Sequence, residues 1–82
     1  MNNEQRVIDV IKALLTRHKR PVDHVRIESP LYRGGLGLDS LGAAELSTML
    51  EMTLGRDPYS EGQVPQTVND IVQFYETAAG GQ

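Results

Sequence analysis

The hydroxyl of Ser40 is the side chain of this sequence best placed to do chemistry. It stands in the run Leu36-Gly37-Leu38-Asp39-Ser40-Leu41, where a glycine-containing stretch meets the predicted start of a helix. A serine at a helix start is exposed and lies near backbone N–H groups that lack helical acceptors. Because those donors and the helix dipole favour negative charge, an anionic group attached to Ser40 would lie in a favourable field. The Asp39 carboxylate opposes that charge, so we expect Asp39 to cap the helix or to serve recognition instead.

Other arrangements of reactive side chains are weak. The sequence has no cysteine, which excludes disulfides, thiolate metal ligands and a cysteine nucleophile. His18 and His24 have no metal-ligand pattern around them, and the glycines at 34–37 lack the spacing of a dinucleotide-binding motif. No nucleophile, base and acid can be assembled into a catalytic set. We therefore expect no metal site and no catalytic residue.

Two longer helices are predicted in the first two thirds of the chain, at about 4–18 and at 40–54. Apolar residues in the first recur at the i, i+3, i+4, i+7 spacing of an amphipathic helix, and Pro21 marks its end. Gly55 is a typical terminator for the second. The expected inner faces consist of Val7, Ile8, Ile11, Leu14 and Leu15 in the first helix, and of Leu46, Met49, Leu50 and Leu54 in the second.

The remaining third of the sequence predicts a short helix at 59–64 and a last helix at 67–78, with Thr67 as its N-cap.

Apolar residues recur through the long stretch at about 19–38, so we expect this loop to be ordered. No segment alternates with period two, so no sheet is expected. The prediction is one all-α domain over residues 1–82, a bundle of three to four helices with a long ordered loop between the first and second.

The run around Ser40 resembles the attachment motif of acyl carrier proteins, usually written G-x-D-S-L, and its Leu-Gly-Leu-Asp-Ser-Leu form is common in polyketide carriers. The resemblance extends from Val7 to Tyr75. In that family a phosphopantetheinyl transferase moves 4′-phosphopantetheine from coenzyme A onto the motif serine, and the thiol of this arm holds acyl groups as thioesters. The resemblance implies that Ser40 carries the arm, with Asp39 and Leu41 as motif neighbours. It also implies a phosphoprotein that is a substrate of enzymes and has no catalytic activity itself.

The same resemblance implies a docking face on the second helix for the transferase and for acyl-loading, condensing and tailoring enzymes. Leu41 and Met52 would supply apolar contacts, and Glu45 a charge for a basic partner residue. This helix carries only two acids, Glu45 and Glu51, whereas fatty-acid carriers have many, which favours polyketide or related natural-product biosynthesis. The expected face comprises Leu41, Ala44, Glu45, Thr48 and Met52.

Size and charge limit the partners. The chain has 82 residues and a net charge of −3, and residues 36–82 carry one base and seven acids. Such a surface repels nucleic-acid phosphates and attracts basic protein surfaces. No apolar run approaches the ~20 residues that span a bilayer, and no secretory signal is visible. We expect a cytoplasmic monomer without nucleic-acid or membrane partners.

Two alternatives stay open at this point. The first is an aminoacyl or peptidyl carrier of the same fold. The second is a small helical protein–protein interaction module in which Ser40 is only a helix N-cap, since serine is among the preferred capping residues.

Overall fold

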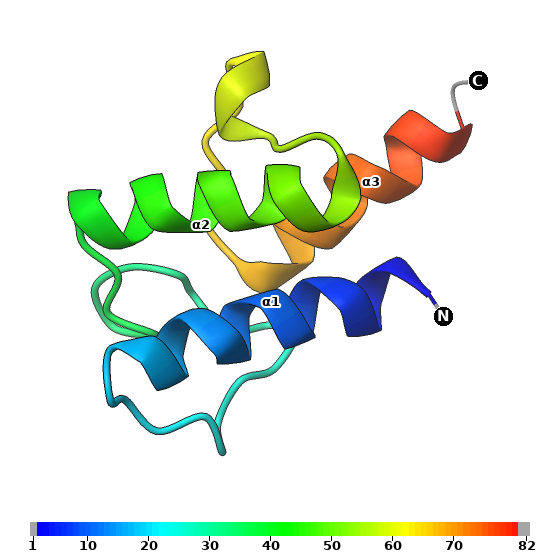
Figure 1. Cartoon of the computed structure of the whole chain (residues 1–82). Helices are drawn as coiled ribbons and strands as arrows, with labels where there is room; N and C mark the ends of the chain where they lie inside the picture. Colours follow the sequence, from blue (N-terminus) through cyan, green and yellow to red (C-terminus); the bar gives the residue numbers. More distant parts are fainter. Residues whose placement is uncertain (1, 81–82) are drawn as a thin grey trace.

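The computed structural model describes the backbone of residues 2–80 and the side-chain surroundings of residues 2–77. Three helices build this part of the chain: α1 (Asn3–Arg17), α2 (Ser40–Leu54) and α3 (Val68–Gly80), with a short 3₁₀ turn, η1 (Tyr59–Glu61), and no strand. In Figure 1, α1 and α2 lie side by side and run in opposite directions. Because α1 packs against both α2 and α3, it is the central helix. The predicted all-α bundle is confirmed, with three helices rather than four.

Local capping explains where the helices begin and end. The Asn2 side chain accepts a hydrogen bond from Gln5 N (2.8 Å) at the start of α1. Gly55 adopts the left-handed conformation (φ 86°) at the end of α2, as predicted. Thr67 caps α3 by accepting from Asp70 N (3.1 Å), while Asp70 accepts in return from Thr67 N (3.2 Å). The boundaries of α2 match the prediction, and those of α1 and α3 differ by one or two residues.

The helix predicted at 59–64 is shorter than expected. Only residues 59–61 form a 3₁₀ turn, so the prediction for residues 62–64 is wrong. The reason is Gly62, whose backbone is left-handed (φ 83°) and cannot continue a right-handed helix. Gln63 N instead donates to Pro58 O (2.9 Å), which closes the turn.

The core lies between the three helices. The last helix contributes Val68, Ile71, Val72 and Tyr75 to it, which recur at helical spacing and are all buried. Ile8, Met49 and Leu54 are only partly buried, whereas Val10 and Phe74 are buried without having been predicted. The buried apolar residues are Val7, Val10, Ile11, Leu14, Leu15, Leu31, Leu38, Leu46, Leu50, Val68, Ile71, Val72, Phe74 and Tyr75.

The long loop between α1 and α2 is ordered by backbone hydrogen bonds, as expected. Leu31 N donates to Gln66 O (2.8 Å) and Val68 N to Ser29 O (3.0 Å), so the loop pairs with the segment that enters α3. Leu38 N donates to Leu31 O (3.0 Å) within the loop, and both of these leucines are buried. The loop thereby fixes the residues immediately ahead of α2. Within residues 2–80 no helix combines the length and apolarity needed to cross a bilayer.

Candidate functional site

Asp39, not Ser40, caps the start of α2. Its Oδ1 accepts a hydrogen bond from Gly42 N (2.8 Å), and its carbonyl accepts from Ala43 N (2.9 Å). The backbone of Asp39 is extended (φ −107°, ψ −169°), as an N-cap requires. The capping role expected of Asp39 is confirmed. The capping role that one alternative gave to Ser40 is wrong, because Ser40 is already the first helical residue.

Ser40 is exposed at the first position of α2. No side-chain hydrogen bond of its hydroxyl occurs among the described residues. The N–H groups of Ser40 and Leu41 have no acceptor within the helix, because the helical ladder begins only with Ala43 and Asp39 accepts from Gly42. An oxygen anion attached to Ser40 would lie close to these two donors.

The Asp39 carboxylate is ionised near neutral pH. The hydrogen bond from Gly42 N is the largest cause that lowers the pKa of Asp39 below 3.8. Some loss of solvation opposes it, and the charges of Arg20 and His18 lower the pKa further. Asp39 therefore carries a negative charge next to the Ser40 hydroxyl, and two basic residues from beyond the end of α1 lie close enough to act on it.

A cavity of about 100 Å³ lies beside this helix start. It brings His18 and Arg20, which follow α1, next to residues on both sides of Ser40. Its lining residues are Leu15, His18, Arg20, Gly37, Leu38, Asp39, Leu41 and Gly42.

The five residues predicted to form a docking face lie at the surface of α2. Leu41 is 63% exposed and Met52 81%, so both present apolar surface to the solvent. Glu45 is half-buried and pairs with His18 through its Oε1. A basic group on a partner would therefore compete with His18 for Glu45, a contact that the sequence did not indicate.

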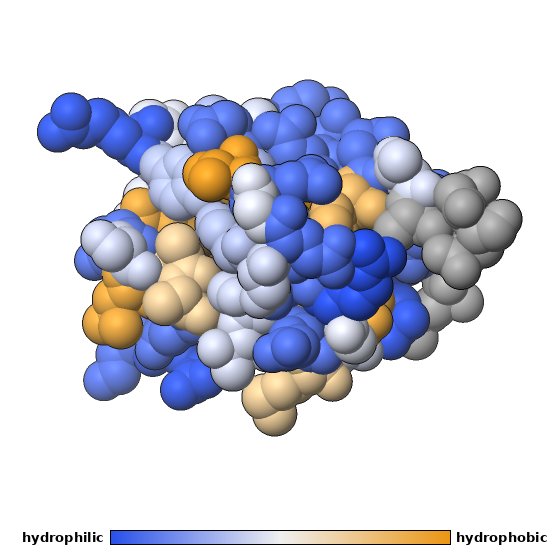
Figure 2. Space-filling view, turned by 90° about the horizontal axis from the view of Figure 1, so that it is seen from above, coloured by the Kyte–Doolittle hydropathy of each residue, from blue (hydrophilic) through white to orange (hydrophobic). Residues whose placement is uncertain are grey.

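A groove of about 320 Å³ lies between the end of α1 and the outer side of α2. It contains four of the five predicted docking residues and adds Arg17 from α1; Leu41 borders the smaller cavity instead. Figure 2 views the molecule from the side occupied by α2 and η1, and its hydrophobic surface is divided into separate patches by hydrophilic residues. The groove is lined by Arg17, Ala44, Glu45, Thr48, Met49 and Met52.

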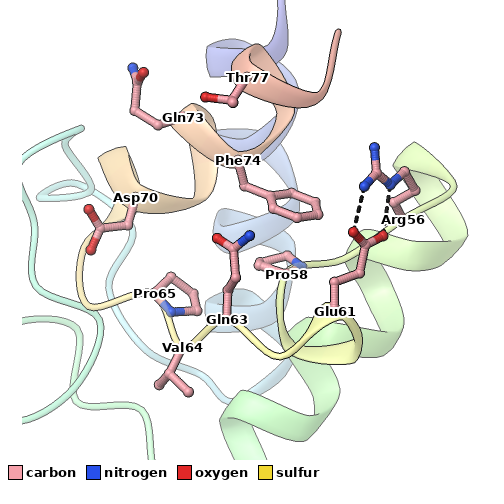
Figure 3. Close-up of a pocket in the computed structure, with 10 residues that line it drawn as sticks. All are labelled: Arg56, Pro58, Glu61, Gln63, Val64, Pro65, Asp70, Gln73, Phe74 and Thr77. Carbon is pink, nitrogen blue, oxygen red and sulfur yellow. Dashed lines mark hydrogen bonds and ion pairs between the residues drawn. The ribbon is translucent and has the colours of Figure 1, made fainter. Parts of the chain in front are cut away.

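A larger cavity, about 510 Å³, lies at the other end of α2 (Figure 3). There the Phe74 ring points from α3 toward Arg56, whose guanidinium lies 5.1 Å from the ring centroid and pairs with Glu61. A helix of 15 residues is about 22 Å long, so this cavity is remote from Ser40. Within the described residues no group of acidic or histidine side chains could hold a metal ion.

Comparison with family models, with curated proteins and with solved structures gives no match to this chain. The site is therefore defined by its own geometry. The residues that sequence reasoning missed are Arg17, His18 and Arg20, because a basic cluster at a helix end is usually a solvated surface. Its position directly before the long loop that leads to Ser40 was the one available signal.

Proposed function

We propose that this chain is a carrier protein that bears 4′-phosphopantetheine on Ser40 and holds acyl groups as thioesters on the thiol of that arm. The observation that carries the proposal is the exposed Ser40 hydroxyl at the first position of α2, where Asp39 already performs the capping. Among the described residues this hydroxyl makes no side-chain hydrogen bond that would hold the fold together. The backbone N–H groups of Ser40 and Leu41 have no helical acceptor and suit the phosphodiester. The residues present thus fit the group.

Attachment requires a transferase and coenzyme A. The Ser40 Oγ forms a bond to the phosphorus that bears the pantetheine, the pyrophosphate bond breaks, adenosine 3′,5′-bisphosphate leaves, and the hydroxyl proton passes to a base or to water. The arm then supplies the thiol that this cysteine-free chain lacks. In this proposal the chain catalyses no reaction and acts as a tether that raises the effective concentration of its cargo at partner enzymes.

The docking face on α2 belongs to the same proposal. Leu41 offers an exposed apolar contact next to the arm, and Met52 offers another farther along the helix. The partners are then the transferase and the acyl-loading, condensing and tailoring enzymes of a polyketide or related pathway. The monomeric state and the cytoplasmic location expected from the sequence are also part of it.

Mass spectrometry tests the proposal. The purified chain is incubated with coenzyme A, Mg²⁺ and a broad-specificity phosphopantetheinyl transferase. We expect the wild type to gain one phosphopantetheine and Ser40→Ala to gain none. Thr53→Ala, which removes an exposed hydroxyl near the far end of α2, is the matched control and should be modified like the wild type. Circular dichroism of Ser40→Ala should match the wild type, because an exposed first-turn side chain contributes little to folding.

A wild type that stays unmodified with several such transferases contradicts the carrier proposal. That result would favour the interaction module, for which the exposed Leu41 and Met52 are the supporting surface. If the wild type is modified instead, loading it with acyl or with aminoacyl groups distinguishes the acyl carrier from the aminoacyl carrier.

A further inference from the structure

The chain turns sharply at the end of α1 and brings Arg20 back toward the start of α2. Lys19 N donates to Thr16 O (3.0 Å) and Arg20 N to Leu15 O (2.9 Å), the two hydrogen bonds of a Schellman motif. Lys19 adopts the left-handed conformation (φ 58°) that this motif requires. The turn therefore directs Arg20 away from the path of α1.

The Arg20 guanidinium lies against the backbone of the loop just before α2. Its Nη1 donates to Leu36 O (3.3 Å). The same Nη1 lies next to Gly37, since a Cβ built there would be 2.8 Å from it. Arg20 thus contacts two residues of the run that contains Ser40.

Arg20 also lines the small cavity next to Ser40, together with Asp39 and Leu41 on either side of that serine. His18 lines the cavity too, but its Nε2 contacts Glu45. A guanidinium has five N–H donors, and the bond to Leu36 O uses one. Among the described residues, Arg20 is thus the cation at this cavity that is not engaged in an ion pair.

A phosphodiester on Ser40 would place a second negative charge beside the ionised Asp39. Like charges at such short range repel, and the first turn of α2 carries no basic residue to offset them. A guanidinium binds phosphate oxygens through paired, charge-assisted hydrogen bonds. Arg20 is placed to supply the missing positive charge from outside α2.

We propose that Arg20 binds the phosphodiester of the arm on Ser40, and so fixes the base of the arm against the cavity between the loop and α2. This inference rests on the proposed function, since the phosphodiester exists only if Ser40 is modified. Arg20 is a positioning residue for the arm, and its guanidinium lies against Leu36 O and Gly37.

Nitrogen-15 NMR of the arginine side chains tests the inference on the whole chain. Apo protein and protein converted with coenzyme A and a transferase are compared, with mass spectrometry to verify complete conversion. We expect the Arg20 Nε–Hε signal to shift on conversion and its exchange with water to slow, whereas Arg33, an exposed arginine of the same loop that does not line the cavity, stays unchanged. About 1 M NaCl, where the Debye length is about 3 Å, should reduce the effect on Arg20.

A second measurement follows the arm itself, by relaxation of an isotope-labelled pantetheine. Arg20→Gln should make the segment next to the phosphate more mobile, Arg20→Lys should restore part of the order, and Arg33→Gln should have no effect. Complete conversion with an unchanged Arg20 signal overturns the inference and leaves the carrier proposal intact. Failure of the wild type to accept the arm overturns both.

Discussion

Asp57 is the one buried charged residue among the described side chains, with 1% exposure. Its carboxylate accepts hydrogen bonds from the Ser47 hydroxyl (2.8 Å), the Ser60 N–H (3.0 Å) and the Ser60 hydroxyl (2.6 Å). Burial raises the pKa of Asp57, but these hydrogen bonds lower it more, so the pKa lies below 3.8. A single side chain thereby ties the segment after α2 to α2 itself.

Replacing Asp57 should destabilise the fold. Asp57→Ala leaves the partner hydroxyls without their acceptor, and we expect a loss of about 1–3 kcal/mol in the free energy of unfolding at pH 7. Asp23→Ala, at an exposed aspartate of the long loop, is the control and should change it by less than about 0.5 kcal/mol. Urea denaturation monitored by circular dichroism measures both.

The pH dependence of this effect has a defined sign. Because the folded-state pKa of Asp57 is lowered, its stabilising contribution is present above the ordinary value of 3.8 and is lost as the pH falls through the folded value. The difference between wild type and Asp57→Ala should therefore shrink below pH 3.8. A difference that stays constant down to the acid transition would contradict the assigned hydrogen bonds.

At the scale of the element, the end of α1 combines a favourable motif with an unfavourable residue. Lys19 occupies the left-handed position of the Schellman motif, which glycine usually fills because it has no Cβ. The left-handed conformation costs a residue with a side chain about 1–2 kcal/mol. The strained turn at Lys19 is therefore also the turn that positions the next residue, Arg20.

Lys19→Gly should relieve that strain. We expect the free energy of unfolding to rise by about 0.5–1 kcal/mol, since the greater flexibility of glycine in the unfolded chain offsets part of the gain. Lys19→Ala removes the same charge but keeps the strain, so it should give no gain. Thermal and urea unfolding of the three proteins provide the comparison, and a glycine variant less stable than wild type would refute the strained turn.

At the scale of the whole molecule, α1 joins the other two helices. Ile11 is fully buried in the core, whereas Ile8, three residues earlier on the same helix, is only partly buried. Two further hydrogen bonds hold the bundle together at the end where α1 begins: Arg6 Nη2 donates to Thr53 O (2.9 Å), and Asn3 Nδ2 donates to Glu76 (3.0 Å). The surroundings of the start of α2 depend on this packing, because the end of α1 places His18 and Arg20 beside it.

Ile11→Ala and Ile8→Ala form a matched pair for testing this arrangement. Deleting the buried side chain should cost about 2–5 kcal/mol through lost burial and the cavity left behind, and deleting the partly buried one clearly less. Chemical denaturation gives both values. Equal losses would mean that α1 packs with a different face toward the core than the one described.

The sequence by itself determined the helices and the first residue of α2. Helical periodicity, Gly55 and Thr67 act through contacts within a few residues, so their effects are readable along the chain. The placement of Ser40 at a helix start follows from the same local rules. The helix predicted at 59–64 was too long, and the cause is local as well, because the left-handed backbone of Gly62 ends η1.

Only the tertiary structure decided what surrounds Ser40. The pair His18–Glu45 joins residues 27 positions apart, and the bond from Arg20 to Leu36 spans 16. No periodicity encodes such contacts, because they depend on the path of the long loop and on the packing of α1 against α2. The burial of Val10 and Phe74 has the same origin: a side chain is buried only when a distant segment covers it.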